Sequence, residues 1–247
     1  MRRAAIIASR PGDESSVAAA VARHPNRFTG FFMVDPGAGD AVQRTRRALT
    51  ELGLHTVCLF PAMHHVPLDD PRTARVVEIA AASPGAAVFV HCGLLSIGVR
   101  DKLALPSRFD LALGDPIALS RLAQAFPRMP FLVPHFGAGR FTDLLKAMEQ
   151  CANVHLDTSS SNSWVRAIPG LTLASVFETT LSAVGSTRIL FGTDSSFFPR
   201  GWQRGIYEEQ KAILQGLDVT ADDQALILGG NFDRLFPAST IAATKER

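Results

Sequence analysis

Short runs of apolar residues alternate along this chain with longer stretches in which apolar residues recur at helical spacing. Such alternation is typical of repeated β-α units, whose strands form a parallel sheet. The apolar runs predict seven strands: Arg3–Ala8, Phe28–Val34, His55–Phe60, Ala86–His91, Phe131–His135, Val154–Thr158 and Ile189–Thr193.

The intervening stretches predict helices, and their boundary residues agree with this. Asp115 followed by Pro116 is typical of a helix N-terminus, because aspartate caps the first turn and proline fits the first helical position. The predicted helices are Ser15–Arg23, Ala38–Leu52, Pro71–Ala82, Pro116–Ala125, Thr142–Cys151, Leu171–Val184, Tyr207–Gln215 and Ala221–Ile227. Leu94–Gly114 and Ser195–Gly205 are long connections, which in compact domains often carry function.

A chain of 247 residues with this rhythm predicts one α/β domain over residues 1–247, a TIM-type (β/α)8 barrel. Seven strands are one fewer than the barrel needs. The chain opens inside a predicted strand, so we expect the missing member to precede Met1.

Composition narrows the class of protein. The net charge is +2 and basic residues are scattered, which argues against a nucleic-acid partner. No apolar run is long enough to span a membrane. The three cysteines, Cys58, Cys92 and Cys151, lack CxxC spacing, so we expect reduced thiols in a cytoplasmic protein.

Three predicted strands end in a side chain that binds metals or moves protons: His91, His135 and Asp194. In a parallel barrel the carboxyl ends of the strands form the active-site face, so these residues predict a site there. Imidazole and carboxylate groups suit zinc, manganese or iron. A histidine beside the metal is suited to carry the proton.

These residues stand within a succession of motifs: Phe28–Pro36, Val88–Gly93, Pro134–Gly139, Asn153–Ser160 and Leu190–Asp194. The succession resembles the amidohydrolase-related family of metal-dependent TIM barrels, from about Arg2 to Phe236. Members include hydrolases and non-oxidative decarboxylases of the aminocarboxymuconate semialdehyde type. The resemblance implies that His91 binds a divalent metal, expected to be one zinc ion. It also implies that Asp194 is a ligand that handles a proton, and that His135 is the general acid or base.

The chain departs from the family's pattern at two places. It has no HxH pair, which in the family supplies two ligands from the first strand, and Thr56–Phe60 has no lysine that could bridge two metals. Three protein ligands are the usual minimum for a catalytic metal. Three explanations remain open: a first strand upstream of Met1, replacement of the lost ligands by His64 and His65, or a barrel that has lost its metal and activity. The alternative for the histidine pair is a solvated loop before Asp70, which is expected to cap the next helix.

Further residues are candidates to contact a small-molecule substrate: His64, Arg100, Asp157 and Trp164. Cys92 is expected to face the helices as a core residue. The preferred function is metal-dependent hydrolysis or decarboxylation of a small organic acid or lactone, weakened if the missing ligands are truly absent. The alternative is a truncated, non-catalytic barrel that binds a ligand or partner, with a homodimer formed through exposed strand edges.

Overall fold

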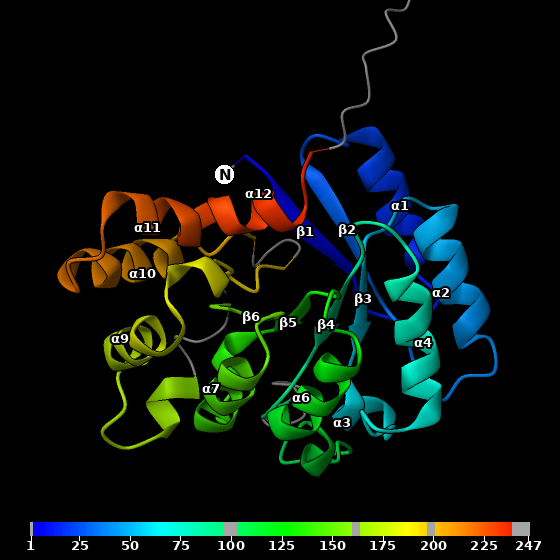
Figure 1. The fold of residues 1–247 in the computed structure, drawn as a ribbon, viewed down its shortest axis with the longest axis horizontal. Helices are drawn as coiled ribbons and strands as arrows, with labels where there is room; N and C mark the ends of the chain where they lie inside the picture. Colours follow the sequence, from blue (N-terminus) through cyan, green and yellow to red (C-terminus); the bar gives the residue numbers. More distant parts are fainter. Residues whose placement is uncertain (1, 96–102, 160–163, 197–200, 239–247) are drawn as a thin grey trace, which may run out of the picture.

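The computed structural model describes residues 2–95, 103–159, 164–196 and 201–238. Seven parallel strands form one curved sheet in sequence order, and helices cover its outer side (Figure 1). The strands are β1 (Ala4–Ala8), β2 (Phe28–Met33), β3 (Thr56–Leu59), β4 (Ala87–Val90), β5 (Phe131–Val133), β6 (Val154–Asp157) and β7 (Ile189–Leu190). The predicted seven-stranded, TIM-barrel-like architecture is therefore confirmed.

The eight predicted helices are present with similar bounds, and the structure adds α3 (Pro61–His64) and α12 (Asn231–Leu235). The helices that match predictions are α1 (Glu14–Arg23), α2 (Ala41–Thr50), α4 (Pro71–Ala81), α6 (Pro116–Ala125), α7 (Phe141–Gln150), α9 (Leu173–Val184), α10 (Arg204–Gly216) and α11 (Ala221–Ala225). Asp115 caps α6 by accepting a hydrogen bond from Ile117 N–H at 2.9 Å, and Asp70 caps α4 by accepting one from Arg72 N–H at 2.8 Å. No helix in the described parts of the chain has both the length and the apolar character needed to cross a bilayer.

The two faces of the sheet have different cores. Residues that point outward, such as Val57, Val88 and Val90, pack against the helices in the larger core. Residues that point inward, such as Phe31, Cys58 and Phe89, form a smaller core inside the curve. Because side chains alternate along a strand, this places His91 on the inner face and Cys92 on the outer one. Cys92 is fully buried in the outer core, as predicted.

The C-terminal segment connects the two ends of the sheet. The side chain of Asn231 donates hydrogen bonds to the carbonyls of Ser186 and Ile189, which fixes α12 beside β7. Arg3, just before β1, donates to Asp233 Oδ1 at 2.9 Å and to the carbonyl of Phe236 at 2.6 Å. Figure 1 shows α12 beside the start of β1. The helix thus joins β1 to β7, which do not pair with each other in the described sheet.

The outer margin of β1 is more exposed than the central strands. Ile7 is 40% exposed and Ala5 is also exposed, whereas every residue of β3 and β4 is buried. Register places Ile7 beside Phe31 of β2, so both side chains face the inside of the curve. The curve is therefore open along this margin.

Six of the seven predicted strands extend too far at their C-terminal ends, four of them by a single residue. β5 ends at Val133 because Pro134 has no N–H to donate and His135 has a φ of 62°. β7 ends at Leu190, so Asp194 lies four residues beyond the strand instead of directly following it. β4 ends at Val90, one residue before His91.

Candidate active site

His91 is a buried imidazole at the carboxyl end of β4. Its ring stacks on Phe60 with centroids 5.2 Å apart, and its Nδ1 has no hydrogen-bond partner among the described residues. Burial, with a smaller contribution from His135, lowers the pKa of His91 to about 3. The ring is therefore neutral at pH 7 and offers a nitrogen lone pair, which is what a metal ion or a substrate proton requires.

His135 lies beside it, at the end of the neighbouring strand β5. The two imidazole rings are edge to face, with centroids 5.2 Å apart. The predicted convergence of these two histidines, 44 positions apart in the chain, is thus present in the structure. Since one ring is buried and the other is partly exposed, the pair presents a neutral inner group and a solvent-accessible outer one.

The backbone that carries His135 is in a left-handed conformation. Five consecutive residues have positive φ: His135 (62°), Phe136 (49°), Gly137 (77°), Ala138 (43°) and Gly139 (88°). For the three that are not glycine this conformation costs roughly 1–2 kcal/mol each. Such strain persists only where surrounding contacts enforce it, and it is concentrated at functional sites.

Two contacts enforce the left-handed turn. Phe136 is fully buried, and its ring lies edge to face against Phe177 of α9 at 5.1 Å. On the other side, Leu94 N–H donates to the carbonyl of Ala138 at 2.8 Å, which ties the turn to the loop after β4. The loops that carry His91 and His135 are therefore held together by backbone as well as by ring contact.

A carboxylate and a hydroxyl at the end of β6 complete this group. Ser159 approaches His135 Nδ1 with its carbonyl oxygen at 2.6 Å and its hydroxyl at 2.9 Å. Asp157 Oδ1 accepts hydrogen bonds from the Ser159 N–H at 2.8 Å, from the Ser159 hydroxyl, and from the His135 N–H at 3.3 Å. Asp157 thus contacts the histidine's backbone, in addition to the substrate-binding role predicted for it.

Asp194 occupies a different environment from the two histidines. It is exposed and has a φ of 49°, and Gln203 donates to the carbonyls of Thr193 and Asp194 at 3.0 and 3.2 Å. The described residues contain no group of three or more His, Cys, Asp or Glu side chains placed to hold a metal ion. The predicted metal role of Asp194 therefore stays a prediction.

His64 does not lie on a solvated loop, so that alternative is wrong for this residue. It ends the short helix α3, is half-buried, and has an Nδ1 without a hydrogen-bond partner among the described residues. Burial lowers its pKa; Asp35 opposes that effect and His65 adds to it. His65 is exposed, with a φ of 55°. His64 remains a candidate to contact substrate.

The other predicted residues divide into those the structure places and those it does not. Trp164 is buried, and its Nε1 has no hydrogen-bond partner within the described ranges. Arg100 lies outside the described residues.

Two features of the site were not predicted from the sequence. The stacking of Phe60 on His91 joins the ends of β3 and β4, and no local motif signals it. The hydrogen bonds of Ser159 to His135 do have a sign in the sequence. Asp157 and Ser159 are two residues apart, so an extended backbone directs both side chains to the same face.

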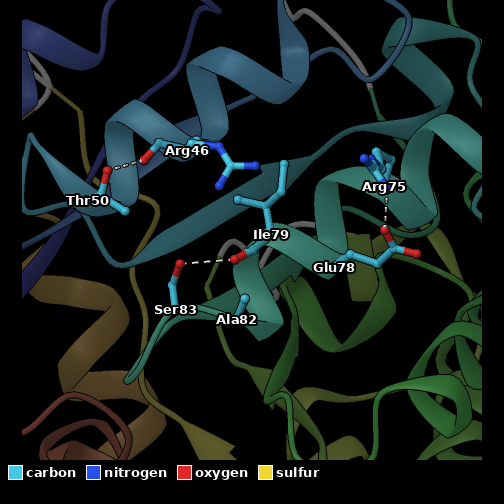
Figure 2. Close-up of a pocket in the computed structure, with 7 residues that line it drawn as sticks. All are labelled: Arg46, Thr50, Arg75, Glu78, Ile79, Ala82 and Ser83. Carbon is cyan, nitrogen blue, oxygen red and sulfur yellow. Dashed lines mark hydrogen bonds and ion pairs between the residues drawn. The ribbon is translucent and has the colours of Figure 1, made fainter.

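A surface hollow elsewhere has different properties. It lies between α2 and α4 and is lined by Arg46, Thr50, Arg75, Glu78, Ile79, Ala82 and Ser83 (Figure 2). Arg75 pairs with Glu78, the Thr50 hydroxyl donates to the carbonyl of Arg46 in α2, and the Ser83 hydroxyl donates to the carbonyl of Ile79 in α4. None of its lining residues comes from a strand end, so we place the candidate chemistry at the histidine pair.

Comparison with known proteins agrees with the fold. The amidohydrolase family model matches residues 1–238, which is nearly the whole chain. The chain belongs to the amidohydrolase family. It is 25% identical to a 2-keto-4-carboxy-3-hexenedioate hydratase of a Sphingobium species, over 95% of this chain and 76% of that protein.

Solved amidohydrolase structures share the fold. A 5-carboxyvanillate decarboxylase from Sphingomonas paucimobilis superposes with a TM-score of 0.67 and 17% identity, over 97% of this chain and 80% of that one. An amidohydrolase from Burkholderia multivorans with bound zinc gives a TM-score of 0.67 and 13% identity, over 96% and 83% of the two chains. At these identities the similarity establishes the architecture of the seven strands.

Proposed function

We propose that this protein is an amidohydrolase-like enzyme that hydrolyses or decarboxylates a small organic acid or lactone. The observation that carries the proposal is the pair of imidazoles, 5.2 Å apart, at the carboxyl ends of β4 and β5. Membership of the family supports it, and so do the organic-acid activities named for the hydratase and decarboxylase relatives.

A divalent metal, zinc or manganese, is part of this proposal, and the described residues fit it in part. The buried, unpartnered Nδ1 of His91 has the character of a ligand, and Asp194 is the proposed second one. Two donors are one fewer than a catalytic metal usually has, so we expect weak binding. When bound, such a metal activates water or polarises a carbonyl.

The chain's own residues supply proton transfer and positioning. His135 is partly exposed, and imidazole is the most common proton-transfer group in enzymes, so it is the group proposed to move the proton. His91 stays neutral and does not compete for that proton, because burial holds its pKa near 3. His64 and Trp164 are proposed to contact the substrate from the ends of other elements.

The test is an assay of the purified protein against small carboxylic acids and lactones, with and without added zinc or manganese. Release of CO₂ indicates decarboxylation, and a new carboxylate indicates hydrolysis. We expect His135→Gln to reduce turnover by about 10²-fold or more, the usual contribution of a positioned proton-transfer group. His24→Gln, at an exposed position between α1 and the start of β2, is the control. Equal turnover in wild type and His135→Gln would contradict the proposal.

A further inference from the structure

We propose that Asp157 and Ser159 are positioning residues that hold His135 in the tautomer with its proton on Nδ1, leaving Nε2 as the proton-accepting nitrogen. This inference rests on the proposed function in that it gives His135 a proton to move. The geometry that supports it can be measured without any substrate.

The partner of His135 Nδ1 is the backbone carbonyl of Ser159. The carbonyl oxygen of Ser159 lies 2.6 Å from this nitrogen, and a carbonyl can only accept a hydrogen bond. A short contact of this kind is favourable only if Nδ1 carries the proton. In a neutral imidazole the other nitrogen then has the lone pair. The backbone of Ser159 therefore selects which ring nitrogen can take a proton from a substrate.

Ser159 is held in place by the carboxylate of Asp157. Asp157 Oδ1 accepts from both the N–H and the hydroxyl of Ser159, so the carboxylate fixes the peptide that presents the carbonyl. The same oxygen accepts from the His135 N–H at 3.3 Å, across the gap between β5 and β6. The Asp157 carboxylate thus positions both residues of the contact between Ser159 and His135.

Thr158, between Asp157 and Ser159, is fixed by a buried glutamine. Thr158 points to the opposite face, where its hydroxyl donates to Gln210 Oε1 at 2.6 Å and its carbonyl accepts from Gln210 Nε2 at 3.0 Å. Gln210 is buried on α10. The segment 157–159 is therefore fixed by the helix layer on one side and carries the Asp157 and Ser159 contacts on the other.

Gly192, two residues after β7, lies close to Ser159 and leaves it little space. A Cβ added at Gly192 would lie 2.8 Å from Ser159 Cβ and 3.3 Å from its nitrogen. Gly192→Ala would therefore displace Ser159 without removing any hydrogen-bonding group. Gly205→Ala, with no atom within 4 Å of the added Cβ, is its matched control.

The test is 15N NMR of histidine-labelled protein, with the His135 signals identified by their absence in His135→Gln. In the wild type we expect a protonated, pyrrole-type Nδ1 and an unprotonated, pyridine-type Nε2. Asp157→Ala and Gly192→Ala should convert this single form into the mixture of tautomers of an unconstrained imidazole. Asp157→Asn should restore it, because its Oδ1 still accepts from Ser159 N–H. Ser159→Ala should have a smaller effect, since the carbonyl remains.

The controls separate positioning from general damage. Asp110→Ala removes a carboxylate that accepts from Ala112 N–H in another loop, and Gly205→Ala adds a methyl group on α10. Both should leave the His135 signals unchanged. A wild-type protein with its proton on Nε2, or an Asp157→Ala variant with the wild-type signals, would overturn the inference. Either result would leave the proposed function untouched, whereas absent turnover with intact NMR behaviour would count against the function alone.

Discussion

Gly93 lies against the carbonyl oxygen of Gly137, so closely that a Cβ on Gly93 would stand 2.0 Å from it. This approach brings the loop after β4 onto the left-handed turn after β5. His91 precedes Gly93 by two residues and His135 precedes Gly137 by two. The distance between the two imidazoles therefore depends on a backbone contact that only glycine permits.

Gly93→Ala should accordingly destabilise the protein strongly. The backbone clash and the φ of +78° act together, and we expect a loss of more than about 3 kcal/mol in the free energy of unfolding. Gly85→Ala has a similar φ of +73° with no atom within 4 Å, so it should lose only about 1–2 kcal/mol. Urea denaturation measures both, and equal losses would show that the approach to Gly137 has no energetic effect.

Arg3→Met should weaken the connection between β1 and α12. The Arg3 side chain is 13% exposed and reaches Asp233, the Phe236 carbonyl and Thr29, so we expect a loss of about 1.5–3 kcal/mol. Arg2 reaches the same Asp233 at 3.7 Å, but its side chain is 93% exposed. Arg2→Met should therefore change stability by less than about 0.5 kcal/mol. Thermal unfolding of the two variants decides whether burial of Arg3 makes the difference.

Stability should fall as the pH is lowered below 6.5. Burial, with Arg234 and Arg188, lowers the pKa of His155 to about 4 from its ordinary value of 6.5. Between these two pH values the unfolded chain binds more protons at His155 than the folded chain does. The contribution of His155 to the free energy of unfolding is therefore fully present above pH 6.5, and it decreases toward pH 4 by up to about 1.4 kcal/mol per pH unit.

The variant His155→Leu should flatten this dependence. Denaturant midpoints at pH 7, 6, 5 and 4 give the slope, and His24→Gln, at an exposed position, is the control. His91 is retained in both variants and contributes to the same decrease, because its pKa is also lowered by burial. A slope that His155→Leu leaves unchanged would show that His155 takes up its proton equally in the folded and unfolded chains.

The exposed margin of β1 should promote self-association. Unpaired strand edges invite pairing with another chain, and Ile7 adds an apolar side chain that is 40% exposed. We expect concentration-dependent dimers in analytical ultracentrifugation and at least about tenfold weaker association in Ile7→Lys. Ile168→Lys changes a side chain of similar exposure, 38%, away from the strand margin. Monomers at all concentrations, or an equal effect of both substitutions, would contradict this expectation.

The parts of the structure that follow from periodicity could be predicted from the sequence. Alternation along a strand predicts that Cys92 faces the helices, and Cys92 does lie in the outer core. Asp115 and Asp70 were recognised as caps because a proline follows each at the first helical position. These features depend on residues adjacent in the chain.

The features that were missed depend on contacts between distant segments or on very short elements. Helix α3 has four residues, too few for a period to be visible, so His64 was weighed as a loop residue. The left-handed turn at His135 is enforced by Phe136 and Ala138 contacting α9 and the β4 loop, which local sequence does not encode. The two glycines of that turn, Gly137 and Gly139, were its visible sign.

The connection that α12 makes between β7 and Arg3 has a consequence during synthesis. Arg3, just before β1, is synthesised 230 residues before its hydrogen-bond partner Asp233. A nascent chain can pair its strands in sequence order, but Arg3 has no partner in α12 until that helix has been synthesised. Co-translational folding therefore leaves Arg3 and the start of β1 accessible to other chains while the later strands, β2 to β7, are being made.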